Sequence, residues 1–162
     1  MKLLQNLFGK NDEITLASPV DGKLVSIKTV NDPTFSGEIL GKSVAIMPSD
    51  GKFCSPADAT VTTVLQTGHA VAITTDEGAE ILIHIGLDTV KLNGAHFHVV
   101  AGEGQKVKTG DLLIEADLES IRAEGYDIIT PVIICNSDQF SEILAETEKE
   151  IAKGDRIFVL RK

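Results

Sequence analysis

The feature that most constrains this chain is the regular spacing of turn residues between short runs of alternating apolar and polar side chains. Glycine, proline, aspartate or asparagine interrupts the sequence about every 8–12 residues, and the runs between them suit strands with one buried face. This spacing is typical of an all-β sandwich or barrel. The predicted strands cover residues 14–17, 22–30, 43–48, 59–66, 69–75, 79–85, 95–100, 111–118, 129–135 and 156–161.

Two segments, residues 117–123 and 138–149, have a periodicity that predicts short helices. The second segment begins with two candidate capping residues and places three apolar side chains on one helical face. These residues are Ser137 and Asp138 at the start, and Phe140, Ile143 and Leu144 on the face.

A sequence repeat suggests that the fold contains two similar halves. Residues 18–27 and 55–64 both begin with Ser-Pro, continue through an aspartate and end in an alternating strand-like run. In each copy a proline-containing turn leads into a strand with one buried face. Residues 104–113 form a third unit of tight turn and strand, so we expect related motifs to pack together.

Composition narrows the class of protein. The 162 residues suffice for one domain with a core of its own, which we place at residues 14–162 after a flexible N-terminal arm, residues 1–13. A net charge of −9 argues against a nucleic-acid partner, because nucleic-acid binding requires a basic surface. No run reaches the roughly 18 apolar residues of a membrane span, so we expect no stable membrane insertion.

The cysteines and the N-terminus bear on the compartment. Cys54 and Cys135 have no CxxC spacing, and no signal peptide is recognisable, which together favour free thiols and a cytoplasmic location. Both cysteines stand in strand-like apolar segments, and we expect both thiols to be buried.

Two histidines stand out from this framework. His84 lies between Ile83 and Ile85 in a predicted strand, so alternation places it on the face of Leu82, opposite the isoleucines. His69 lies at the start of the preceding predicted strand. A single histidine in such a place is more often a satisfied core or edge residue. Two that meet at one surface suggest chemistry, because a neutral imidazole titrates near physiological pH and is a good nucleophile.

Strand geometry predicts how these side chains lie. Residues two apart in a strand project to one face, so Thr67 is placed to hold His69 by a hydrogen bond that fixes its tautomer. A symmetric hairpin centred between Asp76 and Glu77 would set His69 directly opposite His84. A register slip of one residue would break this pairing.

Several separated motifs, in order along residues 14 to 160, resemble the glucose-family enzyme IIA of the bacterial sugar phosphotransferase system. They are Asp32-Pro-Thr-Phe-Ser36, Ser55-Pro-Ala-Asp58, Thr67-Gly-His-Ala70, His84-Ile-Gly-Leu-Asp-Thr-Val90, Glu103-Gly-Gln-Lys-Val107 and Thr130-Pro-Val132. The resemblance implies an all-β fold, an antiparallel β-sandwich or barrel of a duplicated hybrid motif with short peripheral helices.

The resemblance also implies a phosphotransferase component. His84 would accept a phosphoryl group on Nε2 from the histidine phosphocarrier protein and pass it to a cysteine of a IIB domain during sugar uptake. His69 would donate a hydrogen bond to the phosphoryl oxygens, and Thr67 would hold the tautomer of His69. A P–N bond is labile, and exchange between two side-chain nucleophiles requires no metal ion or phosphate-binding loop, so no cofactor is predicted.

Other residues take roles by the same resemblance. Four would flank the site, and for the two aspartates a turn-capping role is the structural alternative. Four apolar residues would form a docking rim for partner proteins, although an aromatic residue near a site is often part of the core. The flanking residues are Asp32, Asp88, Gly86 and Val90, and the rim residues are Phe35, Ile39, Leu40 and Leu65.

Two further possibilities stay open. His96 and His98 depart from the family pattern and could lie on one strand face as zinc ligands, which would suit a LytM-like zinc peptidase. No secretion signal or His-x3-Asp segment supports that alternative, and a solvent-facing pair on an edge strand explains His96 and His98 better.

His69 and His84 make only half of a zinc site, so we predict no resident metal. A regulatory role, binding transporters or enzymes, could accompany phosphoryl transfer.

Overall fold

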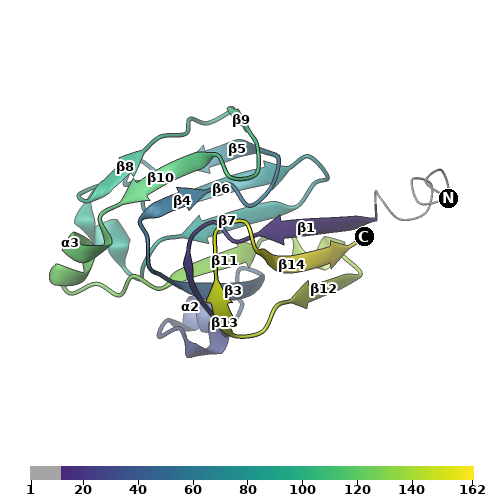
Figure 1. Ribbon diagram of the computed structural model, residues 1–162, viewed down its shortest axis with the longest axis horizontal. Coiled ribbons are helices and arrows are strands. Elements are labelled where there is room, and N and C mark those ends of the chain that lie inside the picture. Colours follow the sequence, from purple (N-terminus) through teal and green to yellow (C-terminus); the bar gives the residue numbers. More distant parts are fainter. Residues whose placement is uncertain (1–11) are drawn as a thin grey trace.

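The fold is that of a computed structural model in which residues 12–162 are described. Residues 1–11, most of the predicted N-terminal arm, lie outside the described residues. The strands form antiparallel pairs, and the helices are short and peripheral (Figure 1), so the predicted all-β sandwich is confirmed. Among residues 12–162, no helix combines the length and the apolar character that crossing a membrane requires.

The strands of residues 12–162 belong to three sheets. The largest runs in the order β13-β2-β3-β11-β7-β6-β5-β9, and two smaller sheets run β4-β10-β8 and β1-β14-β12. The strands of the large sheet are β2 (Gly22–Val25), β3 (Lys42–Pro48), β5 (Ala59–Val64), β6 (Ala70–Thr75), β7 (Glu80–His84), β9 (Lys106–Val107), β11 (Thr130–Ile134) and β13 (Lys149–Ile151). The smaller sheets contain β1 (Glu13–Ala17), β4 (Lys52–Cys54), β8 (Phe97–Val99), β10 (Leu112–Ala116), β12 (Glu142–Ala145) and β14 (Arg156–Arg161).

Short helical segments occupy the connections. Of the two predicted helices, residues 117–123 are confirmed as α3, which begins at Leu118 and is capped by the Asp117 side chain. The segments are η1 (Ile27–Thr29), α2 (Pro33–Ser36), η2 (Thr89–Leu92), α3 (Leu118–Ala123) and η3 (Ser137–Gln139). The first of these shortens the predicted strand 22–30, which ends at Val25.

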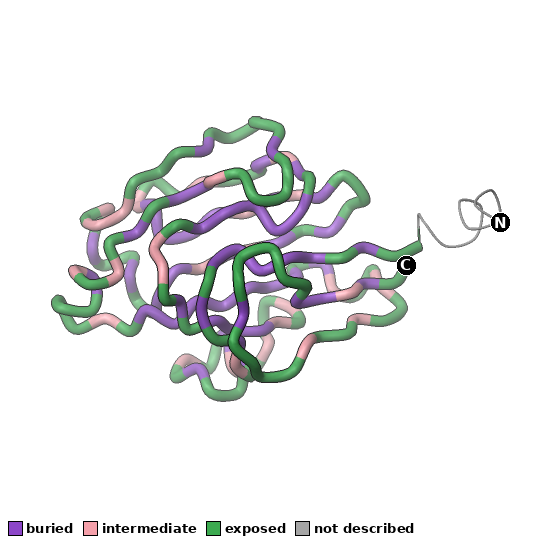
Figure 2. Tube along the Cα trace, viewed as in Figure 1, coloured by how far each residue is buried: buried purple, intermediate pink, exposed green. Residues whose placement is uncertain are grey.

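Alternating strand residues build the core. Along β7, Ile81 and Ile83 are fully buried while Leu82 and His84 are only partly buried, as a strand with one core face requires. The buried segments follow the inner strands and the exposed ones lie in the loops and outer faces (Figure 2). A smaller apolar cluster, which includes Ile27, Phe35 and Leu87, packs under η1 and α2.

The predicted repeat is confirmed as a repeated hydrogen-bonded turn. The buried hydroxyl of Ser18 donates to the carbonyl of Val20 at 2.7 Å, and that of Ser55 donates to the carbonyl of Ala57 at 2.7 Å. The carboxylates of Asp21 and Asp58, one from each copy, accept from backbone N–H groups of the turns that precede β14 and β10. The two copies also bond to each other, through Ala17 N–H to Pro56 and Cys54 N–H to Pro19.

The predicted helix 138–149 is wrong. Only a single 3-10 turn forms, over Ser137–Gln139, and the chain then continues as β12 and β13. β12 pairs with β14, so Ile143 lies opposite Leu160 and its side chain packs against the core. Pairing with a strand that is already present outweighs a weak helical preference.

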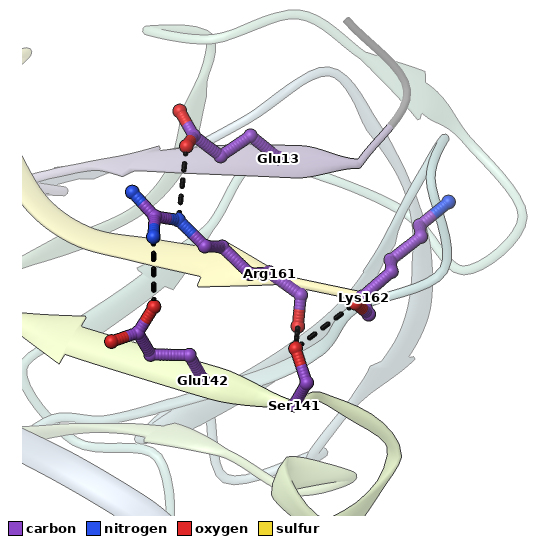
Figure 3. A network of polar contacts seen from close by, with 5 residues as sticks. All are labelled: Glu13, Ser141, Glu142, Arg161 and Lys162. Atoms are coloured by element: carbon purple, nitrogen blue, oxygen red, sulfur yellow. Dashed lines mark hydrogen bonds and ion pairs between the residues drawn. The ribbon is translucent and has the colours of Figure 1, made fainter. Parts of the chain in front are cut away.

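An ionic row ties the third sheet together (Figure 3). Arg161 of β14 donates through Nε to Glu13 of β1 at 3.1 Å and through Nη1 to Glu142 of β12 at 2.9 Å. Opposite charges facing across strands stabilise a sheet modestly when exposed, so the row adds register specificity more than energy. The hydroxyl of Ser141 also donates to the carbonyls of Arg161 and Lys162, and this fixes the end of the chain.

Candidate active site

The strand β7 presents His84 at its C-terminal end. Ile83 and Ile85 on either side are completely buried, whereas His84 points away from that core face and is partly buried. The sequence prediction that His84 shares a face with Leu82, opposite the isoleucines, is therefore confirmed. The core isoleucines fix the strand, and the strand directs the imidazole outward.

His69 reaches the same place from the preceding strand, but not in the predicted register. Ala70, not His69, lies opposite His84, and the N–H of Ile85 donates to the carbonyl of His69 at 2.7 Å. The hairpin loop has three residues with Gly78 at φ 101°, so its centre is Glu77 and the register moves by one.

The two imidazoles meet despite the changed register. Their ring centroids are 5.0 Å apart and their planes are almost perpendicular, at 80°. β6 begins only at Ala70, and Gly68 adopts a left-handed φ of 71°, so the alternation of β6 does not extend back through His69. The positive φ of Gly68 is the backbone feature that the strand argument lacked.

Hydrogen bonds orient both rings. The hydroxyl of Thr67 lies 2.6 Å from Nδ1 of His69, which confirms the predicted contact. Nδ1 of His84 lies 2.8 Å from the carbonyl oxygen of Gly86. Because a carbonyl can only accept, Nδ1 of His84 carries the proton, and Nε2 of the neutral ring keeps its lone pair.

Both histidines are held neutral at physiological pH. Burial, and then the neighbouring His84, lower the pKa of His69 from 6.5 to about 4. Burial also lowers the pKa of His84, against smaller raising effects of the Gly86 hydrogen bond and of the Asp32 and Asp88 carboxylates. A neutral imidazole with a free Nε2 is the nucleophilic form of histidine.

Gly86 is placed so that only glycine fits. Its φ is 78°, and an added Cβ would lie 2.6 Å from the Thr89 side chain and 2.8 Å from the carbonyl oxygen of Asp127. The buried hydroxyl of Thr89 donates to the carbonyl of Ile85 at 2.6 Å, and this bond closes the loop that contains Gly86. The sequence predicts Gly86 only as a flanking residue, and its carbonyl as partner of His84 was not anticipated.

The two flanking aspartates differ in what their side chains do. Asp32 caps α2, accepting from the N–H of Thr34 at 3.0 Å, as the structural alternative expected. Asp88 makes no side-chain cap for η2, and its backbone is left-handed at φ 58°. Both carboxylates lie close enough to His84 to favour its protonated form. Each therefore adds negative charge to the site, and Asp32 also fixes a helix start.

The predicted docking rim is exposed except at one residue. Ile39 is 72% exposed, and Leu40 and Leu65 are also exposed. Val90, predicted as a flanking residue, is 50% exposed. Phe35 differs from the expectation, because it is only 6% exposed and its ring packs on His84 with a centroid distance of 4.9 Å. The remaining rim residues leave apolar side chains open to solvent, which suits contact with a macromolecule.

Two hollows lie away from the histidines. One of about 760 Å³ lies between η1, the start of β3 and the β12 segment, and one of about 480 Å³ lies between the start of β3 and the η3–β12 segment. Neither is lined by His69 or His84. The histidine pair thus occupies a surface rather than either of these hollows, which fits a protein partner better than a small free substrate.

His96 and His98 do not form a metal site with neighbouring residues. Within residues 12–162, no group of three or more histidine, cysteine, aspartate or glutamate side chains is placed to hold a metal ion. His96 precedes β8 and contacts Glu124, whereas His98 is exposed on β8, an edge strand paired with β10. The exposed edge position predicted for the pair therefore holds for His98 but not for His96, whose backbone is left-handed at φ 74° and whose side chain is partly buried.

The two cysteines are free thiols, but only one is buried. Cys54 lies in β4 and is buried, as predicted, whereas Cys135 follows β11 and is exposed, so the prediction for Cys135 is wrong. Burial raises the pKa of the Cys54 thiol, and partial desolvation of the sulfur together with the Glu80 carboxylate raises the pKa of Cys135, so neither is poised as a thiolate.

Comparisons with known proteins agree on one family. Residues 14–140 match the family model described as phosphoenolpyruvate-dependent sugar phosphotransferase system, EIIA 1. The chain is 41% identical over 155 residues to the PTS system glucose-specific EIIA component of Bacillus cereus, covering 94% of each. It is 42% identical over 152 residues to the PTS system beta-glucoside-specific EIIBCA component of Halalkalibacterium halodurans, of which it spans only 24%.

The fold is also similar to that of a solved protein of this system. A solved structure of glucose permease IIA from Mycoplasma capricolum superimposes with a TM-score of 0.86 at 33% identity, covering 94% of this chain and 97% of that one. The family match over residues 14–140 includes both histidines.

Proposed function

The chain belongs to the EIIA 1 family of the phosphoenolpyruvate-dependent sugar phosphotransferase system and is a phosphotransferase component of it, and from this premise we propose that His84 is the residue that carries the phosphoryl group. The observation that supports this assignment is the hydrogen bond from Nδ1 of His84 to the Gly86 carbonyl. That bond leaves Nε2 as the only ring nitrogen with a free lone pair.

In the proposed transfer, the lone pair of His84 Nε2 forms a bond to phosphorus. The P–N bond of the donor phosphohistidine breaks, and its electron pair returns to the donor nitrogen. The chain must position the group and stabilise its charge, since the bond changes themselves need no further reagent. In the second exchange, a thiolate takes the phosphoryl group from Nε2, and the electron pair returns to His84.

His69 is proposed to stabilise the phosphoryl group. The Thr67 hydroxyl, donating to Nδ1 of His69, would place the proton of the neutral ring on Nε2, which becomes a hydrogen-bond donor. The centroid distance of 5.0 Å brings this donor to the side of the nucleophile. His69 is therefore assigned to hold phosphoryl oxygens, and Thr67 to hold His69.

The partners in this proposal are the histidine phosphocarrier protein as donor and a IIB-domain cysteine as acceptor. The similarity to a relative named as an EIIBCA component supports the second assignment, because that name joins A and B parts in one protein. The exposed apolar side chains of Ile39, Leu40 and Leu65 support both as protein partners. Two free thiols accord with a cytoplasmic location, which belongs to the same proposal.

The test is phosphorylation in a purified system. The protein is incubated with phosphoenolpyruvate, enzyme I and the histidine phosphocarrier protein, and its intact mass is measured. We expect a gain of one acid-labile phosphoryl group in the wild type and in a His98→Ala control, and no gain in His84→Ala. A full gain in a folded His84→Ala variant would refute the assignment.

A further inference from the structure

Phe35 occupies a position that the predicted docking role does not explain. Its ring is buried, and its centroid lies 4.9 Å from that of His84 at an interplanar angle of 52°. The reactive imidazole therefore contacts two rings, Phe35 and His69. A buried side chain against the reacting group is placed to act on that group rather than on a partner.

The local structure holds Phe35 there firmly. Pro33 begins α2, the Asp32 side chain caps it, and the N–H of Phe35 donates to the Asp32 carbonyl at 3.0 Å. The Phe35 ring belongs to the small apolar cluster that also contains Ile27 and Leu87. Since Leu87 follows Gly86 directly, this cluster joins α2 to the loop that orients His84.

Phosphoryl transfer changes the charge of the His84 ring. The neutral imidazole holds a proton on Nδ1, and a new bond from Nε2 to phosphorus leaves the ring with a positive charge. Partial burial disfavours that charge. The ring cation must therefore be stabilised by the groups that surround it.

These groups come from several segments of the chain. The Gly86 carbonyl accepts the Nδ1 proton, and the Asp32 and Asp88 carboxylates favour a positive charge, whereas His69 disfavours one when it is itself protonated. Phe35 supplies an uncharged aromatic ring whose centroid lies 4.9 Å from that of His84. A cation within about 6 Å of an aromatic centroid is attracted by the ring quadrupole, and the attraction grows when the pair is shielded from water.

We propose that Phe35 stabilises the phosphorylated, positively charged imidazole of His84 through a cation–π contact. The proposal rests on the proposed function, in that His84 must carry the phosphoryl group. It assigns Phe35 a part in the transfer equilibrium, separate from docking. Removing the π face while keeping the volume apolar makes the charged ring less favourable.

The experiment compares Phe35→Leu, which removes the π face, with Phe35→Tyr, which keeps it. Ile27→Val is the matched control, because it loosens the same apolar cluster without touching a ring. Histidine NMR signals are titrated in each unphosphorylated protein and again after phosphorylation. Rates of phosphoryl uptake from the histidine phosphocarrier protein are measured in parallel.

We expect Phe35→Leu to lower the pKa of the His84 imidazolium by about 0.4 to 1.5 pH units in both forms. Phosphoryl uptake should slow by about three- to thirtyfold, with Phe35→Tyr and Ile27→Val close to the wild type. Slower uptake in Phe35→Leu with an unchanged or raised pKa would overturn the proposal and assign Phe35 to docking. Equal losses in Phe35→Tyr and Phe35→Leu would also overturn it.

The two readouts separate this proposal from the proposed function. The titration of unphosphorylated His84 requires no phosphoryl transfer and reports the π contact alone. If the wild type takes up no phosphoryl group while Phe35→Leu still lowers that pKa, the proposed function fails although the cation–π contact is real. If the wild type is phosphorylated and the pKa does not fall, the proposal about Phe35 alone fails.

Discussion

The Nδ1 atom of His84 lies 2.8 Å from the carbonyl oxygen of Gly86, two residues further along the chain. This contact determines which nitrogen is reactive. The carbonyl oxygen can only accept a hydrogen bond, so Nδ1 of His84 carries the proton and Nε2 keeps the lone pair. It depends on a left-handed glycine, so the chemistry of one residue is linked to the backbone conformation of another.

Substitution of Gly86 should impair phosphoryl uptake. In Gly86→Ala the added methyl group would lie 2.6 Å from Thr89 and 2.8 Å from the Asp127 carbonyl, which must displace the Gly86 carbonyl from Nδ1. We expect at least a tenfold slower uptake and a loss of about 1–3 kcal/mol of stability from backbone strain. Uptake is followed by intact mass against time, and stability by urea unfolding.

Gly78→Ala is the matched control for that variant. Gly78 also has a positive φ, 101°, but a Cβ there would meet nothing within 4 Å. The Gly78→Ala variant should lose stability but keep the wild-type rate of phosphoryl uptake. Equal losses of rate in the two variants would mean that general destabilisation, not the Gly86 carbonyl, explains the effect.

His69→Gln should separate the two exchanges. Glutamine retains a donor beside His84, so the variant should still accept a phosphoryl group but pass it on at least tenfold more slowly. Single-turnover transfer to a purified IIB domain, starting from the phosphorylated variant, measures the second exchange directly. Normal transfer to IIB would contradict the division of labour between His69 and His84.

The buried His69 should also make stability depend on pH. The folded state holds its pKa near 4, below the ordinary 6.5, so the unfolded chain binds more protons between these values and stability is lost as pH falls. At pH 5 the free energy of unfolding should be about 2 kcal/mol lower than at neutral pH. Urea unfolding at pH 7 and pH 5 measures it.

His69→Gln provides the comparison for this titration. The variant lacks the imidazole, so its stability should fall less between pH 7 and pH 5 than that of the wild type, by about 2 kcal/mol. An identical fall in both proteins would show that His69 is protonated in the folded state as easily as in the unfolded chain.

The repeated turns predict equal effects of equal substitutions. Ser18 and Ser55 are each 1% exposed, and each donates to the carbonyl two residues ahead. Ser18→Ala and Ser55→Ala should each cost about 1–3 kcal/mol, because each leaves a buried carbonyl short of a hydrogen bond. Thermal or urea unfolding of the two variants measures these costs. A large cost for one serine alone would mean that the two turns are not equivalent.

The sequence predicted those features of the structure that depend on residues close together in the chain. The Ser-Pro repeat and the outward face of His84 follow from local sequence patterns, and the structure contains both. The contact between Thr67 and His69 also forms, although the left-handed Gly68 interrupts the strand alternation from which it was predicted. In each case the residues involved are near neighbours in sequence.

Contacts between distant segments account for what the sequence did not predict. Residues 138–149 have helical spacing, but β14 offers a partner edge that only the folded chain presents. The hairpin register depended on whether the loop has two or three residues, which alternation alone does not reveal. Phe35 reaches His84 from a separate helix, and no spacing rule connects residues that far apart.

The most direct test of the account is the position of the phosphoryl group on the ring. The phosphorylated protein, labelled with ¹⁵N at histidine, is examined by NMR for coupling between phosphorus and each imidazole nitrogen. The account predicts coupling to Nε2 of His84, with Nδ1 still protonated against the Gly86 carbonyl. Coupling to Nδ1 of His84, or to either nitrogen of His69, would contradict it.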